Sequence, residues 1–289
     1  MTYAAAALPP LTWDLLVKRR ASATQGVPPG KEALTWVANT VTLICGERNA
    51  VLVDTFLSQE HTRELIDWIE LHDRNLETIY ITHGHPDHFF GLALLLEHFP
   101  RARALAPRDV VEKMKKVIAD EQRDARWSRL FSMQDSPRLE PAQALEGDSF
   151  ELEGHVLRTI DLGHTDTDDT TALYVPSIGL VVSGDCVYND AHPYLAESDE
   201  AGRRAWLAAL DTIEALEPVA VVAGHGPLDP DSSPRHIDET RQYILEFERA
   251  NRATGTAREL YDWMIERYPD RINPGSLWGA AHAAKKSGR

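Results

Sequence analysis

Apolar and polar positions in the first part of the chain follow patterns typical of short strands and amphipathic helices. Runs rich in valine, leucine and aromatic residues at 35–45 and 49–56 are joined by Gly-Glu-Arg-Asn, which predicts a β-hairpin. Ser58 is expected to cap a helix that reaches Asp73, because apolar residues then recur on one helical face. The pattern next predicts a strand at 76–83, a helix at 89–99 and a strand at 101–107.

The second part of the chain combines strands with longer helices. The charged segment 108–135 lacks strand signals, so we expect one or two surface helices inserted between the halves of the sheet structure. The other predicted elements are strands at 149–162, 171–176, 179–184 and 219–224, a helix at about 201–216, and further helices within 235–289. We expect 1–234 to form one domain and 235–289 to pack on it as a helical extension.

Strands and helices mixed in both halves indicate an α/β layered fold. Two mixed β-sheets packed face to face with helices outside, an αββα sandwich, would bury the apolar strands well. A doubly wound parallel sheet is the competing architecture. The absence of a glycine-rich phosphate loop after the first strand and the opening hairpin both count against it.

Composition narrows the class of protein. The chain has 289 residues, and its formal net charge of −15 disfavours nucleic acid as a partner. Two cysteines, Cys45 and Cys186, make no disulfide framework in a chain of this size and favour a reducing compartment. The N-terminus lacks the pattern of a signal peptide, and no apolar run is long enough to cross a membrane. We therefore expect a cytoplasmic protein without a membrane partner.

Ligand chemistry is concentrated in the segment Ile-Thr-His-Gly-His-Pro-Asp-His-Phe-Phe-Gly. His83 and His85 have alternate spacing, which directs both side chains to one side of an extended segment. Asp87 and His88 follow on the turn into a helix and can reach a second position. Because imidazole and carboxylate groups are common ligands, the turn predicts two neighbouring divalent metal ions. Zinc is the default by ligand type, and iron or manganese would fit the same set.

Remote ligands are expected at the ends of other strands. His164, Asp185 and His225 each follow an apolar run and have a glycine beside or just before them. Glycine allows a sharp turn and a close approach of the backbone to a site. Loops at strand ends are where a rigid scaffold places chemistry.

The motifs Thr-His-Gly-His-Pro-Asp-His, Gly-His-Thr, Ser-Gly-Asp and Ala-Gly-His-Gly, in this order, resemble the metallo-β-lactamase-fold hydrolase superfamily over about residues 35–230. The resemblance implies an αββα sandwich with two metal ions in the cleft between the sheets. It implies two ligand sets, His83, His85 and His164 for the first ion, and Asp87, His88 and His225 for the second. Asp185 would bridge both ions, and Asp54 would support the ligand turn from behind.

The same resemblance indicates the reaction. Glyoxalase II-like thioesterases, lactonases and phosphodiesterases have aspartate at the position of Asp185, whereas zinc β-lactamases have cysteine or serine there. Tyr188 resembles a lactonase tyrosine that contacts the substrate carbonyl, and His192 is a weaker candidate for substrate contact. We expect a metal-bridging hydroxide to attack a small-molecule ester, lactone or thioester, with Asp87 helping to move the proton. Cys186 is expected to be a small buried residue rather than a nucleophile.

Other reactions of the fold remain open. A phosphodiesterase, a β-lactamase-type amide hydrolase or a single-iron oxidoreductase resembling persulfide dioxygenases would use a related site. The flavin-linked di-iron branch is disfavoured because it usually has glutamate where His85 stands. Apolar residues of 108–135 and 235–289 could line an acyl pocket or only pack their helices, and the sequence leaves homodimer formation open.

Overall fold

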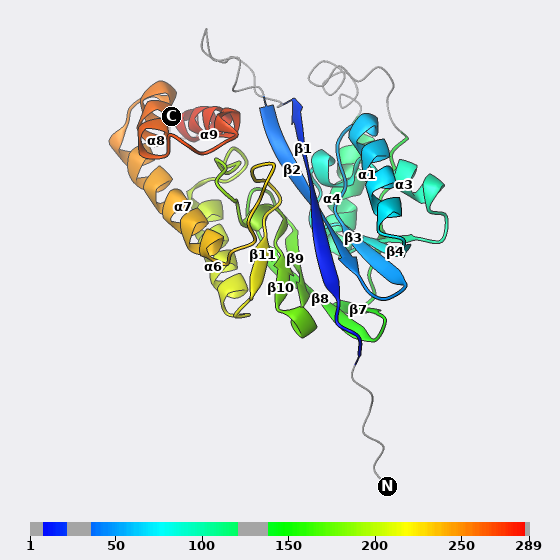
Figure 1. Ribbon diagram of the computed structural model, residues 1–289. Coiled ribbons are helices and arrows are strands. Elements are labelled where there is room, and N and C mark those ends of the chain that lie inside the picture. Colours follow the sequence, from blue (N-terminus) through cyan, green and yellow to red (C-terminus); the bar gives the residue numbers. More distant parts are fainter. Residues whose placement is uncertain (1–7, 22–35, 121–137, 287–289) are drawn as a thin grey trace.

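The computed structural model describes residues 8–21, 36–120 and 138–286, which form two mixed β-sheets with helices on both outer faces (Figure 1). Three apolar clusters fill the three interfaces of this sandwich. One lies between the first sheet and its helices, one between the two sheets, and one between the second sheet and its helices. This arrangement confirms the predicted α/β layered fold, and each sheet buries both faces.

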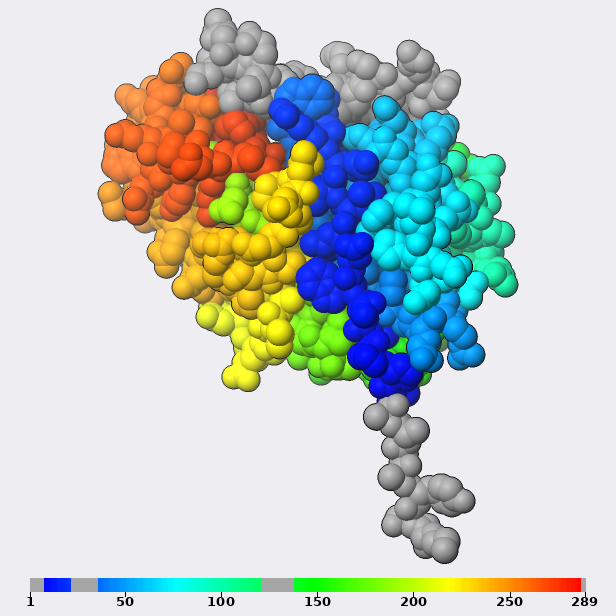
Figure 2. Space-filling model, viewed as in Figure 1, coloured from blue at the N-terminus to red at the C-terminus, as the bar shows by residue number. Residues whose placement is uncertain are grey.

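The first sheet has six strands in the order β1-β2-β3-β4-β5-β6. Its strands are β1 (Thr12–Ala21), β2 (Trp36–Cys45), β3 (Asn49–Val53), β4 (Asn75–Tyr80), β5 (Arg103–Ala106) and β6 (Gln143–Ala144). β2 and β3 form the predicted hairpin. The edge strand β1, antiparallel to β2, was not predicted, because its Asp, Lys and Arg residues interrupt the apolar alternation. Figure 2 shows β1 (blue) as a band on the surface between the N-terminal and C-terminal helices.

The second sheet has five strands in the order β11-β10-β9-β8-β7. They are β7 (Ser149–Leu152), β8 (His155–Gly163), β9 (Thr170–Val175), β10 (Leu180–Val182) and β11 (Ala220–Val222). The single strand predicted at 149–162 is two strands, because Glu153 and Gly154 turn the chain with φ of 50° and 87°. The Glu153 carboxylate accepts hydrogen bonds from three backbone N–H groups of the β2–β3 turn, so this turn also ties the two sheets together.

Helices cover the outer faces. On the first sheet lie α1 (Gln59–Leu71), α3 (Leu92–His98) and α4 (Arg108–Ala119), and the short α2 (Pro86–Phe89) precedes α3. Ser58 caps α1 as predicted, whereas the single helix expected at 89–99 is divided between α2 and α3. α4 belongs to the predicted insert and buries Val110 and Met114 on the first sheet; most of the insert's remainder, 121–135, lies outside the described residues.

The C-terminal helices pack on the second sheet. They are α6 (Glu200–Glu214), α7 (Arg235–Ala253), α8 (Ala257–Arg267) and α9 (Pro274–Lys286), and two 3₁₀ turns, η2 (Pro176–Ile178) and η3 (Gly184–Cys186), precede them in the chain. Phe247, Met264 and Leu277 from α7, α8 and α9 share one apolar cluster with Val181 of β10 and Trp206 of α6. Within the described residues, no helix combines the length and apolar character needed to cross a membrane.

Candidate metal centre

The histidine-rich turn connects β4 to α2. The strand ends at Tyr80, and His85 stands at the N-cap position in an extended conformation before Pro86 begins the helix. His83 and His88 are buried, and their ring centroids are 4.1 Å apart. The strand-to-helix turn therefore gathers these side chains at one end of the first sheet.

Two adjacent groups of side chains have the composition and spacing of metal ligands. The first group contains His83, His85, Asp166 and Asp185, and the second contains Asp87, His88 and His225. In each group the potential ligand atoms all lie within 4.8 Å of one another. Asp185 also joins the groups, because its Oδ1 lies 3.3 Å from His88 Nε2 and its Oδ2 lies 2.9 Å from His225 Nε2. A carboxylate in this place can contact two ions at once.

Unpartnered buried atoms test whether these residues fit metal ions. His83 Nε2, His88 Nε2, Asp166 Oδ2 and Asp185 Oδ1 are buried without a well-aligned hydrogen bond, and their contacts, such as Asp166 Oδ2 to His85 Nδ1 at 2.7 Å, are with other residues of the two groups. A buried polar atom left in this state costs about 1–3 kcal/mol, so such atoms rarely occur together without a reason. Since all four face the same two groups, the donor set fits two divalent ions.

Each ligand histidine is oriented by a partner on its outer ring nitrogen. The contacts are His83 Nδ1 to Thr82 Oγ1 (3.0 Å), His85 Nε2 to Glu197 Oε1 (3.3 Å), His88 Nδ1 to Asp54 Oδ2 (2.9 Å) and His225 Nδ1 to the Ala38 carbonyl (2.7 Å). These contacts leave the inner nitrogen of each ring directed at the site. Outer partners of this kind fix the tautomer and the orientation of metal-binding histidines.

Asp54 holds the turn from behind, at the place implied by the resemblance. Its Oδ1 accepts from the Thr82 backbone N–H, and its Oδ2 accepts from the Thr82 hydroxyl and lies 2.9 Å from His88 Nδ1. The residue has a left-handed backbone with φ of 64° directly after β3. One buried carboxylate thus positions two ligand histidines, His88 directly and His83 through Thr82.

The structure does not bring His164 into either group. His164 Nδ1 lies 2.6 Å from Asp168 Oδ1, and its Nε2 lies 3.0 Å from Ser198 Oγ. Asp166, which the sequence analysis did not single out, is fully buried in the first group instead, with Oδ2 2.7 Å from His85 Nδ1. A register shift near the end of β8 and the left-handed Gly163 turn the loop so that Asp166 faces inward. Its place two residues after His164, in the same loop, was the available signal.

Charges in the centre favour cations. Burial alone would raise the pKa of Asp185, but His225 and His88 hold it well below its usual value. Burial likewise opposes ionisation of Asp87, yet Arg20 and His88 keep its pKa well below the usual range. Burial and the neighbouring His88 lower the pKa of His83 to about 4. Asp87, Asp185 and His83 are therefore held in the forms that bind metal. Burial would lower the pKa of His85 and His88, but Asp166 and Asp185, respectively, raise it well above the usual value, so a bound ion would displace a proton from these two rings.

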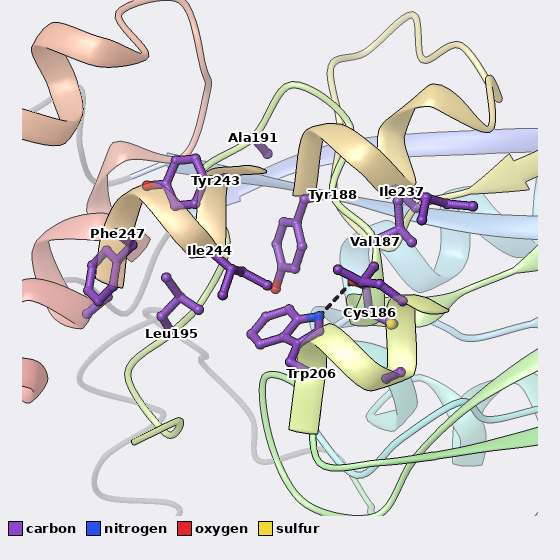
Figure 3. Close-up of a cluster of buried hydrophobic side chains, with 14 of the residues drawn as sticks. Cys186, Val187, Tyr188, Ala191, Leu195, Trp206, Ile237, Tyr243, Ile244 and Phe247 are labelled. Atoms are coloured by element: carbon purple, nitrogen blue, oxygen red, sulfur yellow. Dashed lines mark hydrogen bonds between the residues drawn. The ribbon is translucent and has the colours of Figure 1, made fainter. Parts of the chain in front are cut away.

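Tyr188 lies behind the Asp185 carboxylate. Its hydroxyl donates to Asp185 Oδ2 over 2.9 Å, and its ring stacks on His225 with centroids 5.5 Å apart. Figure 3 shows the ring within the apolar cluster of the second sheet, close to Trp206. Burial, followed by the charge of Asp185, raises the pKa of the phenol well above its usual value, so Tyr188 remains a hydrogen-bond donor.

The other two candidates, His192 and Cys186, are buried. His192 is fully buried, with Nδ1 2.8 Å from the Tyr243 hydroxyl. Cys186 is a free, buried cysteine whose carbonyl accepts from Trp206 Nε1 (Figure 3), and burial raises the pKa of its thiol well above the usual value. A thiol in this state is a poor nucleophile at neutral pH.

Two further residues, which the sequence analysis missed, contact the second group. Arg20 Nη2 of β1 donates to Asp87 Oδ2 over 2.5 Å, and Asn39 Nδ2 of β2 donates to the same oxygen over 2.6 Å. Neither residue lies in a recognisable motif, and only strand pairing brings β1 to the site.

Known proteins share this architecture and part of this sequence. The sequence model of the metallo-beta-lactamase superfamily matches residues 34–225. DIM-1 metallo-beta-lactamase, in a crystal exposed to ceftazidime, is 18% identical with a TM-score of 0.61, covering 83% of this chain and 99% of that chain. A metallo-beta-lactamase family protein from Thermus thermophilus is 22% identical with a TM-score of 0.61, covering 94% of each chain. A metallo-beta-lactamase from Pontibacter korlensis is 17% identical with a TM-score of 0.57, covering 82% of this chain and 99% of that chain.

Proposed function

This chain belongs to the metallo-beta-lactamase superfamily, and we propose that it is a dinuclear metal-dependent hydrolase of a small-molecule ester, lactone or thioester. The observation that carries the proposal is Asp185, which lies between two ligand groups and contacts histidines of the second. An aspartate at this position resembles the thioesterase and lactonase branches of the superfamily more than its zinc β-lactamases.

The residues that would hold the two ions are His83, His85, Asp166, Asp87, His88 and His225, with Asp185 shared. When bound, two divalent ions, zinc by default, would supply Lewis acidity and a water molecule activated at neutral pH. Such chemistry needs no covalent intermediate on the protein. The residues themselves orient the site, since outer partners fix every ligand histidine.

Tyr188 supports Asp185 in this proposal. A neutral phenol that donates to one carboxylate oxygen fixes the rotation of the carboxylate while leaving its Oδ1 for the site. Asp87 was expected to help move a proton. Arg20 and Asn39 both donate hydrogen bonds to its Oδ2, and these bonds would compete with a proton for that oxygen. We assign Asp87 to metal binding because it belongs to the second ligand group.

The substrate class rests on charge and on the carbonyl chemistry of related branches. A formal net charge of −15 disfavours a nucleic-acid substrate. We therefore propose that the substrate is a small acyl compound and that the protein acts in the cytoplasm. Bound ions would supply the Lewis acidity that hydrolysis of an ester, lactone or thioester carbonyl needs.

Proton release in a pH-stat tests this function. Metal-loaded protein would be assayed with lactones of several chain lengths, S-acyl thioesters, aryl esters, a cephalosporin and bis-p-nitrophenyl phosphate. We expect turnover of one acyl class, its loss in His83→Ala, and full retention in His98→Ala, which changes an exposed histidine on α3. Turnover confined to the phosphodiester or the cephalosporin would replace the proposed substrate class. Full acyl turnover by His83→Ala would remove the metal mechanism.

A further inference from the structure

The second ligand group differs from the first in having a fixed positive side chain on it. Arg20 Nη2 lies 2.5 Å from Asp87 Oδ2, and the Arg20 side chain is only 14% exposed. The guanidinium also donates from Nε to Asn39 Oδ1 (2.7 Å) and from Nη1 to the Ala21 carbonyl (2.9 Å). These bonds hold a permanent positive charge in one orientation at the edge of the centre.

The oxygen that Arg20 contacts is the one that faces the histidines of the second group. Asp87 Oδ2 lies 3.8 Å from His88 Nε2 and 3.7 Å from His225 Nε2. Asn39 Nδ2 donates to this same oxygen over 2.6 Å. A carboxylate oxygen offers about two lone-pair positions, and here both have a strong donor. A cation bound by His88 and His225 would have to share or displace one of these donors.

The first ligand group has no such competitor. Among the described residues, the side chains that form ion-pair contacts with Asp166 and Asp185 are histidines. Asp185 also keeps its Oδ1 buried without a hydrogen-bond partner, and Asp166 Oδ2 lies 2.7 Å from His85 Nδ1, a residue of the same group. Within the part of the chain that the structure describes, a cation entering the first group therefore meets no guanidinium on its carboxylates, and the donor to Asp185 Oδ2 is the neutral Tyr188 hydroxyl.

We propose that Arg20 is a positioning residue that makes the two metal positions unequal, so that the first group fills tightly and the second weakly. In the metal-free protein its charge neutralises Asp87 and keeps the carboxylate in place. When the second ion binds, the guanidinium repels that ion and competes for Asp87 Oδ2. The inference rests on the proposed metal centre and is independent of the substrate class.

Metal titration without substrate tests this inference. Chelator-treated protein would be titrated with Zn²⁺ against a chromophoric chelator, and with Co²⁺ by absorption spectroscopy to distinguish the two ligand sets. We expect two dissociation constants in the unaltered protein, the second at least about tenfold weaker, on the scale typical of residues around metal ligands. Arg20→Met should tighten the second constant by about tenfold and leave the first unchanged. Arg20→Lys, which keeps the charge, should fall between the two.

Two variants complete the test. Arg19→Met is the matched control, because Arg19 is the neighbour of Arg20 on β1 and its guanidinium lies 5.2 Å from the centroid of the Trp36 ring; both constants should stay unchanged. Asn39→Ala removes the other donor from Asp87 and should also tighten the second dissociation constant. If Arg20→Met does not fold, this variant still tests whether donors to Asp87 weaken the second metal position. Equal affinities in the unaltered protein, or a second constant that weakens or stays the same when a donor is removed, would overturn the inference. Failure of the whole substrate panel would leave these binding results standing.

Discussion

Single residues decide which side chain of the loop after β8 faces the first ligand group. His164 has a partner on each ring nitrogen, and the first turn of α6 lies against it: a Cβ added at Gly202 would be 2.5 Å from its Nε2. Asp166 is fully buried in the first group, with its Oδ2 2.7 Å from His85 Nδ1. Carboxylate in place of imidazole makes the site more negative and richer in oxygen, which favours harder ions such as manganese and iron more than a three-histidine set would.

Metal content measured by atomic emission separates these two residues. Asp166→Ala should lose about one ion per chain, because the first group would retain only His83, His85 and the shared Asp185. His164→Ala should retain both ions, because its side chain contacts neither group. The reverse pattern would show that the loop after β8 rearranges to bring His164 in when metal binds.

Tyr188 acts at the same scale through its single hydroxyl. Tyr188→Phe should lower kcat about tenfold or more with little change in KM, because Asp185 loses the donor that fixes its rotation. Metal content should stay close to that of the unaltered protein. Tyr174→Phe on β9 makes the same chemical change away from the centre, and its kcat should not change. If Tyr188→Phe has an unaltered kcat, the tyrosine contributes only to packing.

At the scale of elements, the site depends on turns that bring strand ends close together. η3 follows β10 and carries Asp185, and it approaches the histidine turn so closely that a Cβ added at Gly184 would lie 2.7 Å from Thr82 Oγ1. Gly184 also has a left-handed φ of 50°. The two turns meet through a residue without a side chain, and Thr82 is the residue that links Asp54 to His83.

Gly184→Ala should therefore destabilise the fold and weaken metal binding together. The left-handed backbone alone costs about 1–2 kcal/mol with a side chain, and the contact with Thr82 adds to it. Gly279→Ala is the matched control: the residue lies in α9 with nothing near the added Cβ, so it should be neutral or stabilising by about 0.5–1 kcal/mol. Urea unfolding and metal titration of both variants measure the two effects, and equal stability of the two variants would contradict this account.

At the scale of the whole molecule, the C-terminal helices are anchored to the site side of the second sheet through buried polar groups. The His192 backbone N–H donates to the Ile272 carbonyl, and its ring contacts Tyr243 of α7. Burial, with a contribution from Arg271, lowers the pKa of His192 to about 3. The folded protein thus holds this imidazole neutral well below the pH at which an unfolded chain would protonate it.

This difference makes stability depend on pH with a definite sign. Between about pH 6.5 and 3 the unfolded chain binds a proton at this position that the folded chain excludes, so the free energy of unfolding falls as pH falls, by at most about 1.4 kcal/mol per pH unit. In chelator-treated protein, His192→Gln should lose less stability than the unaltered chain between about pH 7.5 and 5. His98→Gln should keep the full loss. Parallel curves for His192→Gln and the unaltered protein would show that His192 does not contribute.

The layered fold and most ligands could be predicted from the sequence because they depend on local patterns. Buried strands give apolar runs, a strand-to-helix turn gives the His-x-His spacing, and glycine beside a polar residue marks strand ends. These signals indicated the two-sheet architecture, the β2–β3 hairpin, the Ser58 cap and six of the seven residues in the two ligand groups.

Only the tertiary structure decided the remaining features, because they depend on contacts between distant segments. β1 has charged residues that hide its alternation, and it becomes a strand by pairing with β2. Asp166 replaces His164 because a register shift and the packing of α6 decide which residue of one loop faces inward. Arg20 and Asp87 are 67 positions apart, and no local pattern relates them. The sequence by itself determined which chemistry the chain carries, and the packing of strands and loops determined which side chains share a cation and which one competes with it.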